Sequence, residues 1–175
     1  MMSTSTSPAT STTIGVVSDT HNTLPLWVVD AFKGACLDYI MHVGDIEHES
    51  ILWELELIAP LIAVRGNCDF QPALLKLPTT KTPTMGNAQL IIAHKPNGVN
   101  AVLQKTRCSE VSAPYLLGIH GHTHVPHFTQ AGVDTFVLCP GSPSEPRGGS
   151  APSVAILTIE SEDSTTPPVV RFINP

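Results

Sequence analysis

The sequence predicts a single α/β domain, and three observations support this fold class. In the N-terminal half, short apolar runs alternate with segments of helical spacing, which is typical of parallel strands joined by helices. Polar residues follow the apolar runs directly, at the sheet edge where open α/β folds place their sites. The chain has 175 residues, 42% of them hydrophobic, which is enough to bury one core.

Three strands and two helices are expected in the N-terminal part. The apolar run 14–18 is typical of a buried strand, and 38–43 and 61–64 are the next two strands. The helices between them are 24–32, which has a proline in its first turn, and 49–58, which has apolar residues at helical spacing. Since a helix follows each of the first two strands, we expect the three strands to be parallel.

The middle of the chain changes character. Residues 76–84 contain two prolines and are expected to form an edge strand or a loop. The pattern then predicts a strand at 89–93, a helix at 99–107 and a strand at 115–119.

The C-terminal part reads mainly as hairpins. The short strands 128–129 and 135–138 surround a glycine, and 153–159 could pair with 168–173. Residues 140–149 are rich in Pro, Gly and Ser and are expected to be a loop. We therefore expect the C-terminal half to be more antiparallel than the N-terminal half.

The chain termini and composition limit where the protein acts. Residues 1–13 are nearly all Ser, Thr, Ala and Pro, which predicts a disordered tail before a single domain of residues 14–175. The tail has no secretory-signal pattern, and no apolar stretch approaches the roughly 20 residues that span a bilayer. The four cysteines form no CxxC pair, so a cytoplasmic protein with reduced thiols is expected. The net charge of −6 argues against stable nucleic-acid or membrane binding.

A histidine-rich run follows the predicted strand 115–119 and contains His120, His122 and His124. In an extended segment, the side chains of His122 and His124 leave the same face. Neutral imidazole is a common metal ligand. By itself this run could equally be a solvated turn.

Five strand ends together supply seven oxygen and nitrogen donors. Their mixture of carboxylate, amide and imidazole suits Mn, Fe, Co, Ni or Zn. Seven donors are too many for one tetrahedral ion and suit two ions that share a carboxylate. Individually, the aspartates could instead cap helices and the asparagine could form a turn. The candidate metal ligands are Asp19, His21, Asp45, Asn67, His94, His122 and His124.

These motifs, in this order, resemble the calcineurin-like metallophosphoesterase family, and most closely its small single-domain bacterial and archaeal phosphodiesterases. The segment 139–147 is similar to an Asn-Pro-Gly-Ser…Pro-Arg segment of that subgroup, with Cys139 in place of the asparagine. The resemblance implies a four-layer α/β/β/α sandwich of two mixed sheets flanked by helices. The motifs are Asp19-x-His21, Gly44-Asp45, Gly66-Asn67, His94 and Gly121-His122-x-His124.

The resemblance also implies a phosphodiesterase with two divalent metal ions, manganese being favoured over Fe, Zn, Ni or Co. A hydroxide shared by the ions would attack the phosphorus in line. Two ions, two carboxylates and this hydroxide leave a charge of about +1, which would attract a phosphodiester into an acidic protein. The resemblance assigns Asp19, His21 and His124 to the first ion, Asn67, His94 and His122 to the second, and Asp45 to both.

The catalytic residues implied by the resemblance are Asp45, Asn67, Cys68 and His94. Many family members have a histidine where this chain has Cys68, and that histidine is thought to protonate the leaving group. Cysteine is frequent there in the small subgroup, so activated esters with good leaving groups should be favoured. Alone, Cys68 could also be a small apolar filler.

Several further expectations complete this interpretation. We expect a small phosphate-ester substrate, and a homo-oligomer remains open. The alternatives are a phosphomonoesterase or nucleotide phosphatase, and a catalytically silent scaffold with the same fold, like the related subunit of the retromer coat. Asp69 and Arg147 are candidates for orienting groups near the site, His120 for supporting it, and His42 for an ordinary histidine.

Overall fold

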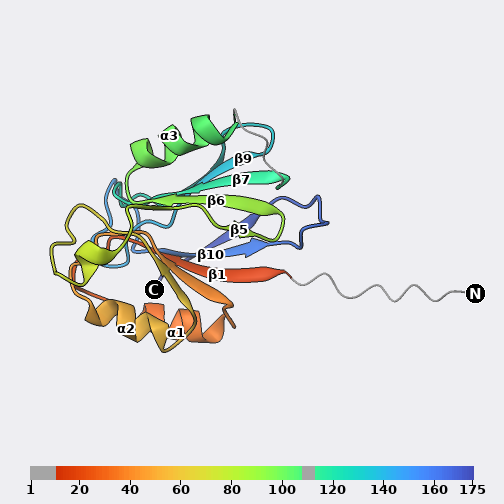
Figure 1. The fold of residues 1–175 in the computed structure, drawn as a ribbon. Helices are drawn as coiled ribbons and strands as arrows, with labels where there is room; N and C mark the ends of the chain where they lie inside the picture. Colours follow the sequence, from red (N-terminus) through yellow and green to blue (C-terminus); the bar gives the residue numbers. More distant parts are fainter. Residues whose placement is uncertain (1–10, 108–112) are drawn as a thin grey trace, which may run out of the picture.

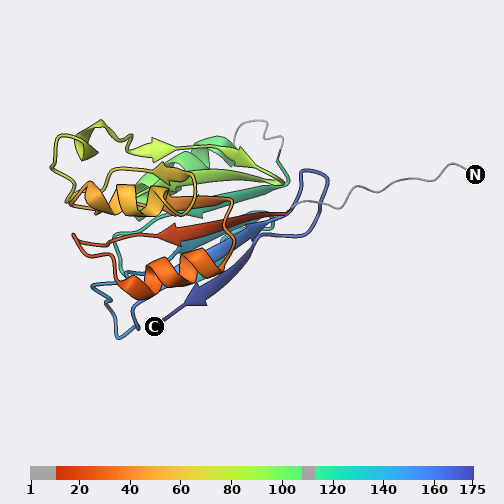
Figure 2. The same cartoon turned by 90° about the horizontal axis from the view of Figure 1, so that it is seen from below.

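The computed structural model describes residues 11–107 and 113–175 and contains two sheets packed face to face between helices (Figure 1). Helices α1 (Leu26–Gly34) and α2 (Ser50–Glu56) cover the outer face of one sheet. Helix α3 (Pro96–Arg107) covers the outer face of the other. Figure 2, seen from below, shows α1 and α2 over the strands of their sheet. The predicted α/β/β/α fold class is confirmed.

The first sheet joins the two ends of the chain. Strands β1, β2 and β3 are parallel, as the sequence predicts, and β10 and β11 extend this sheet through antiparallel pairs on the other side of β1. The strand order is β11-β10-β1-β2-β3. Its strands are β1 (Thr12–Val17), β2 (Tyr39–His42), β3 (Leu61–Ala63), β10 (Val154–Ile159) and β11 (Val169–Ile173).

The second sheet has the order β4-β6-β7-β9-β8, and β5 also pairs with β6. Strands β6, β7 and β9 are parallel, but the two expected hairpins, β8-β9 and β10-β11, are antiparallel, so the C-terminal half is more antiparallel than the N-terminal half, as predicted. Helix α3 carries the chain from β6 back to β7, which a parallel pair requires. The elements not yet bounded are η1 (Leu74–Lys76), β4 (Thr80–Lys81), β5 (Thr84–Met85), β6 (Ala88–Ala93), β7 (Tyr115–Ile119), β8 (His127–Gln130) and β9 (Thr135–Cys139).

Strand β1 shows why the central strands read as continuous apolar runs. Ile14 and Val16 are buried in the core between the two sheets, whereas Val17 packs beneath the helices with Phe32 of α1. A strand covered on both faces needs apolar residues at successive positions. The same double burial holds the strand ends that carry the candidate ligands in fixed positions.

Among the predicted boundaries that were displaced, two have a clear physical reason. Strand β1 begins at Thr12, inside the predicted tail, because Thr12 and Thr13 pair with Ile159 and Thr158 of β10. Helix α3 begins at Pro96 rather than at residue 99, since proline fits the first turn of a helix. The first ten residues of the predicted tail lie outside the described residues. No helix within 11–107 or 113–175 has the length and apolar character needed to cross a membrane.

Candidate metal centre

The turns that follow β1, β2, β6 and β7 meet at one end of the two sheets. The backbone N–H of Asp19 donates to the Gly44 carbonyl, and that of Gly121 donates to the His94 carbonyl, both at 3.0 Å. The Asp19 carboxylate accepts the backbone N–H of His122, with its two oxygens 3.0 and 3.1 Å away. This last contact joins a turn of the first sheet to a turn of the second.

The candidate ligands lie on unusually tight turns. Five of them have a positive φ, which is uncommon for residues other than glycine and clusters at functional sites. The turns therefore redirect the chain at the positions that carry donor atoms. The five φ angles are 54° at Asp19, 43° at His21, 54° at Asp45, 68° at His122 and 58° at His124.

Two glycines of the predicted motifs permit this close approach. A Cβ at Gly66 would lie 2.1 Å from the backbone nitrogen of Asp45. A Cβ at Gly121 would lie 1.8 Å from Ser18 Oγ and 2.6 Å from Asp19 Oδ2. Since any side chain would collide here, these glycines set the distance between the turns.

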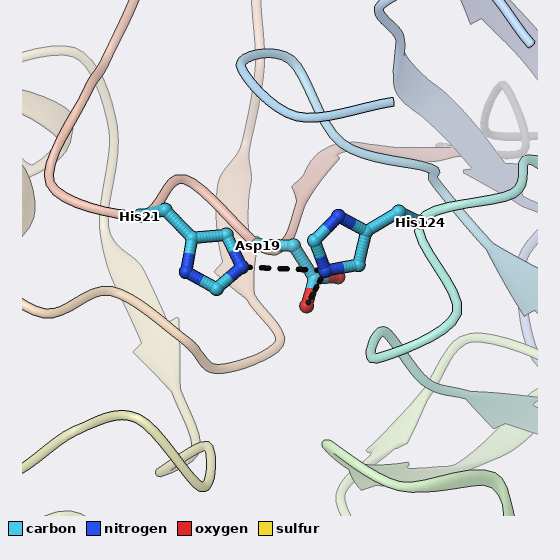
Figure 3. Close-up of side chains that lie close together, drawn as sticks. All are labelled: Asp19, His21 and His124. Carbon is cyan, nitrogen blue, oxygen red and sulfur yellow. Dashed lines mark hydrogen bonds and ion pairs between the residues drawn. The ribbon is translucent and has the colours of Figure 1, made fainter. Parts of the chain in front are cut away.

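Asp19, His21 and His124, which we call the first ligand group, point toward one another (Figure 3). The Nε2 atoms of His21 and His124 are 3.3 Å apart, and His124 Nε2 is 3.4 Å from Asp19 Oδ1. Asp19 and His124 are almost completely buried. Three donor atoms thus meet at one buried point.

The hydrogen bonds of the Nδ1 atoms select one tautomer for each of the two histidine rings. His21 Nδ1–H donates to Glu47 Oε1 at 2.8 Å, and His124 Nδ1–H donates to the Glu145 carbonyl at 2.5 Å. In the neutral rings the Nε2 atoms therefore carry lone pairs that face each other and the Asp19 carboxylate. Donor atoms about 2.1 Å from one ion lie about 3.0–3.4 Å apart, so this arrangement fits a bound cation.

Asp45, His94 and His122 form the second ligand group. His94 Nε2 lies 3.2 Å from Asp45 Oδ2 and has no hydrogen-bond partner among the described residues, although it is buried. His94 Nδ1–H donates to the Val43 carbonyl at 2.9 Å, so Nε2 carries a lone pair when the ring is neutral. Burial lowers the pKa of His94, but the Asp45 and Asp19 carboxylates outweigh it and raise this pKa, so a cation at Nε2 would replace a proton. A cation here would satisfy this orphaned nitrogen.

Electrostatics link the two groups. Burial opposes ionisation of Asp45, but His94 and the Cys68 backbone N–H outweigh it and hold its pKa below the usual range. Burial raises the pKa of Asp19, against the attraction of His94. Burial, the charge of His94 and the charge of Lys95 lower the pKa of His122. The neutral imidazole that a metal needs is therefore favoured at His122.

Asn67 and Cys68 lie at the edge of these groups. Asn67 is exposed, and its amide nitrogen donates to Cys68 Sγ at 3.3 Å. Cys68 Sγ lies within 4.8 Å of ligand atoms of His21 and Asp45. Burial and the Asp45 carboxylate raise the pKa of the Cys68 thiol to about 11, which keeps it protonated at neutral pH.

Asp69 holds two of the turns together. One of its buried carboxylate oxygens accepts the backbone N–H groups of Asp45 and Gly66, at 3.1 and 2.6 Å. The other accepts those of Ile46 and Glu47, at 2.6 and 2.7 Å. The orienting role considered for Asp69 thus takes the form of a carboxylate that positions the β2 and β3 turns.

His42 is more than the ordinary histidine expected from the sequence. Its Nδ1 accepts the Gly44 N–H at 3.2 Å, so its Nε2–H donates to Thr20 Oγ1 at 3.1 Å. Burial and the charge of His94 lower its pKa to about 3, which keeps it neutral. His42 therefore ties the β1 turn to the β2 turn.

The segment 140–149, expected to be a connection or pocket rim, is fastened to the first ligand group. Ser142 Oγ donates to the Asp19 carbonyl at 2.7 Å and accepts the Glu145 N–H at 2.8 Å. Ser144 Oγ donates to the Thr20 carbonyl at 2.8 Å. The only sequence signal for this role is the Pro-Gly-Ser likeness within the segment; the contacts of Glu47 and Glu145 had none.

His120 and Arg147 take minor places. His120 is buried, its Nδ1–H donates to the Gly121 carbonyl at 2.9 Å, and its ring centre lies 5.1 Å from that of His127. It belongs to neither ligand group. Arg147 contacts the site through its backbone N–H, which donates to the His124 carbonyl at 3.4 Å.

Comparisons with known proteins identify the family and the fold of this chain. The profile of the calcineurin-like phosphoesterase superfamily domain matches residues 13–162. A probable metallophosphoesterase of Methanothermobacter thermautotrophicus is 33% identical over 172 residues, which cover 92% of this chain and 97% of that protein.

Two solved structures show the shared fold. A novel archaeal phosphodiesterase has a TM-score of 0.72 and 25% identity, over 92% of this chain and 98% of that one. Vps29 of Entamoeba histolytica, solved with zinc, has a TM-score of 0.64 and 17% identity over the same shares of the two chains, 92% and 98%. Since the family profile spans most of the chain and all seven candidate ligands, this chain belongs to the calcineurin-like phosphoesterase superfamily.

Proposed function

We propose that the protein is a metal-dependent phosphodiesterase that holds one divalent ion in each ligand group. The observation that carries this proposal is that the Nε2 atoms of His21, His124 and His94 gather beside buried carboxylates. Such a site would bind cations tightly, and manganese is the first ion to test, before Fe, Zn, Ni or Co. Two ions would supply an activated water and neutralise charge on the phosphate.

The residues of this chain would orient the reaction. Asp45 offers Oδ2 on the His94 side, while Oδ1 is held by the Cys68 N–H at 2.8 Å. This geometry suits Asp45 to serve both ions. The Asp19 carboxylate lies between two histidines, with Oδ1 3.4 Å from His124 Nε2 and 4.0 Å from His94 Nε2. Asn67 and His94 would face the substrate, because both line a cavity that opens beside the second ligand group.

The protonated Cys68 thiol could pass its proton to the leaving oxygen. Its sulfur is partly exposed at the edge of the site, where a leaving group could reach it. If it does, Cys68→Ala should slow diesters with poor leaving groups by about tenfold or more and spare nitrophenyl esters. Equal slowing of both ester classes, or no slowing of either, would exclude this role.

The decisive experiment loads the metal-free chain with manganese and measures bound metal beside turnover. We expect close to two ions per chain and faster hydrolysis of bis(p-nitrophenyl) phosphate than of p-nitrophenyl phosphate. A preference for the monoester would favour a phosphatase instead. Metal binding without turnover would favour a scaffold, the reading that the likeness to Vps29 suggests. A chain that binds no metal would contradict the proposed metal-dependent activity.

The surroundings of the reaction follow from the same features. We propose that the substrate is a small phosphate ester. We also propose that the protein acts in the cytoplasm, because the described cysteines, Cys36, Cys68 and Cys139, are free thiols.

A further inference from the structure

A cavity of about 400 Å³ opens beside the second ligand group. Asn67 and His94 belong to its lining, which places it next to the proposed ions. Thr79 and Thr80, at the start of the edge strand β4, contribute another part of the wall. This volume lies within the range of small-molecule sites, about 300–1,000 Å³. The cavity therefore has room for a part of the substrate beyond the reacting phosphate.

The charge of this cavity is opposite to that of the whole protein. Of the ten described residues that line it, Arg65 and Lys95 are cationic and none is acidic, although the chain carries a net charge of −6. Arg65 comes two residues before Asn67 and Lys95 directly follows His94, so the same turns hold ligands and cations.

Neither cation is neutralised by a carboxylate of the described chain. No ion pair within residues 11–107 and 113–175 involves Arg65 or Lys95. One guanidinium nitrogen of Arg65 donates to the Leu75 carbonyl at 3.3 Å, which leaves further N–H donors of the fork. Lys95 is exposed and close enough for its charge to act on His122. Both side chains are thus available to an anion.

We propose that this cavity binds a second phosphate group of the substrate, carried by one of the two alcohols of the reacting phosphodiester. The inference rests on the proposed function, since it places this phosphate beside the metal-bound one. A guanidinium fork matches phosphate oxygens in pairs, and an ammonium adds a point charge. The hydroxyl groups of Thr79 and Thr80 add neutral donors. The substrate class is a phosphodiester with an additional phosphomonoester, as in a phosphorylated nucleotide ester.

The test compares two esters on the manganese-loaded protein. One is the p-nitrophenyl ester of thymidine 5′-phosphate, and the other carries an additional 3′-phosphate. We expect kcat/KM for the second ester to be higher by about tenfold or more, mainly through KM. Arg65→Gln and Lys95→Gln should each remove most of this preference, and Arg65→Lys should keep part of it.

The matched control is Lys33→Gln, which removes the same charge from an exposed position on α1. It should keep the full preference for the second ester. Equal kcat/KM for the two esters in the wild-type protein would overturn the proposal. So would a preference that survives both Arg65→Gln and Lys95→Gln.

A binding measurement keeps this test separate from turnover. Calorimetric titration of the metal-free protein compares thymidine 3′,5′-bisphosphate with thymidine 5′-phosphate at low salt. The bisphosphate should bind about tenfold more tightly, and Lys95→Gln should remove the difference. If neither p-nitrophenyl ester is hydrolysed but this difference in affinity is found, the proposed function is wrong and the proposal of a phosphate-binding cavity stands. Equal affinities would overturn the cavity proposal alone.

Discussion

The two ligand groups offer similar donors but lie in different surroundings. Each group has two buried residues and one partly buried histidine, which is His21 in the first and His122 in the second. The first group is hydrogen-bonded to the segment 140–149, whereas the second borders a cavity that carries two cations. We infer that the first group is built to retain an ion and the second to meet the substrate.

The supporting contacts differ in the same way. His21 and His124 of the first group are oriented by Glu47 and by the Glu145 carbonyl, so two loops hold the donor atoms of this group. His94 of the second group is oriented by the Val43 carbonyl, which lies within the buried β2 turn. Orientation of the first group therefore depends on surface loops, whereas His94 depends on the core.

The largest effect is expected where the two groups meet. Asp45→Asn should lower kcat/KM for bis(p-nitrophenyl) phosphate by at least about 100-fold and weaken both ions, because a neutral amide serves two cations poorly. Steady-state kinetics and metal titration measure this. Asp30→Asn, at an exposed site on α1, is the control. A variant that loses only one ion would break the symmetry assumed for Asp45.

Asp69→Asn should destabilise the fold around both groups by about 2–4 kcal/mol. Each oxygen of Asp69 accepts two N–H groups, so either orientation of the amide turns an NH₂ toward two donors. Urea unfolding of the metal-free protein measures the loss. Asp38→Asn is the matched control, since the exposed Asp38 side chain accepts a single N–H, that of Thr13, among the described residues. It should cost less than about 1 kcal/mol. Similar losses in both variants would contradict the positioning role.

Glu47→Gln should change the metal affinity of the first ligand group without changing that of the second. Its carboxylate orients His21, so the variant should bind the first ion about tenfold more weakly and leave the second unchanged. Competition with a chelator resolves the two affinities. Glu54→Gln, which removes the same charge from an exposed position on α2, is the control. Equal weakening of both ions would refute the independence of the two groups.

The smallest effect is a pH dependence at His42, which lies behind both groups. Its pKa is about 3 in the fold and 6.5 in the unfolded chain, so acid protonates the unfolded state first. Its contribution to stability is therefore complete above pH 6.5 and is lost as the pH falls toward 3. Between pH 7 and 5.5 this amounts to about 1 kcal/mol. In urea unfolding of the metal-free protein, His42→Asn should show a drop smaller by this amount, and an identical drop would refute the prediction.

Much of the candidate site could be predicted because its ligands are local features of the sequence. Asp19, Asp45 and His94 come immediately after apolar strands, and Gly66 and Gly121 mark turns that admit no side chain. The alternation of strands and helices predicted an α/β domain, and the resemblance carried by the motifs implied its four-layer form. The sequence also predicted seven candidate donors. Six of them form the two ligand groups, and the seventh, Asn67, lies at their edge.

Other features depend on residues that lie far apart along the chain. Asp19 meets the His122 N–H across 103 positions, and Ser142 reaches the Asp19 carbonyl across 123. Nothing near these residues in the sequence indicates such contacts. The parallel β6-β7-β9 centre was likewise missed, because short apolar runs do not reveal the direction of their neighbours.

The sequence by itself thus determined which donors exist and where each strand delivers them, since these depend on local hydrophobicity and turn chemistry. Only the tertiary structure decided how the donors divide into two groups. It also decided which neighbouring groups hydrogen-bond to the histidine rings and select their tautomers. Finally, it decided that one group is hydrogen-bonded to the segment 140–149 while the other borders a cationic cavity. The physical reason is that burial, lone-pair direction and local charge are set by the packing of two sheets, which brings distant turns within hydrogen-bonding distance.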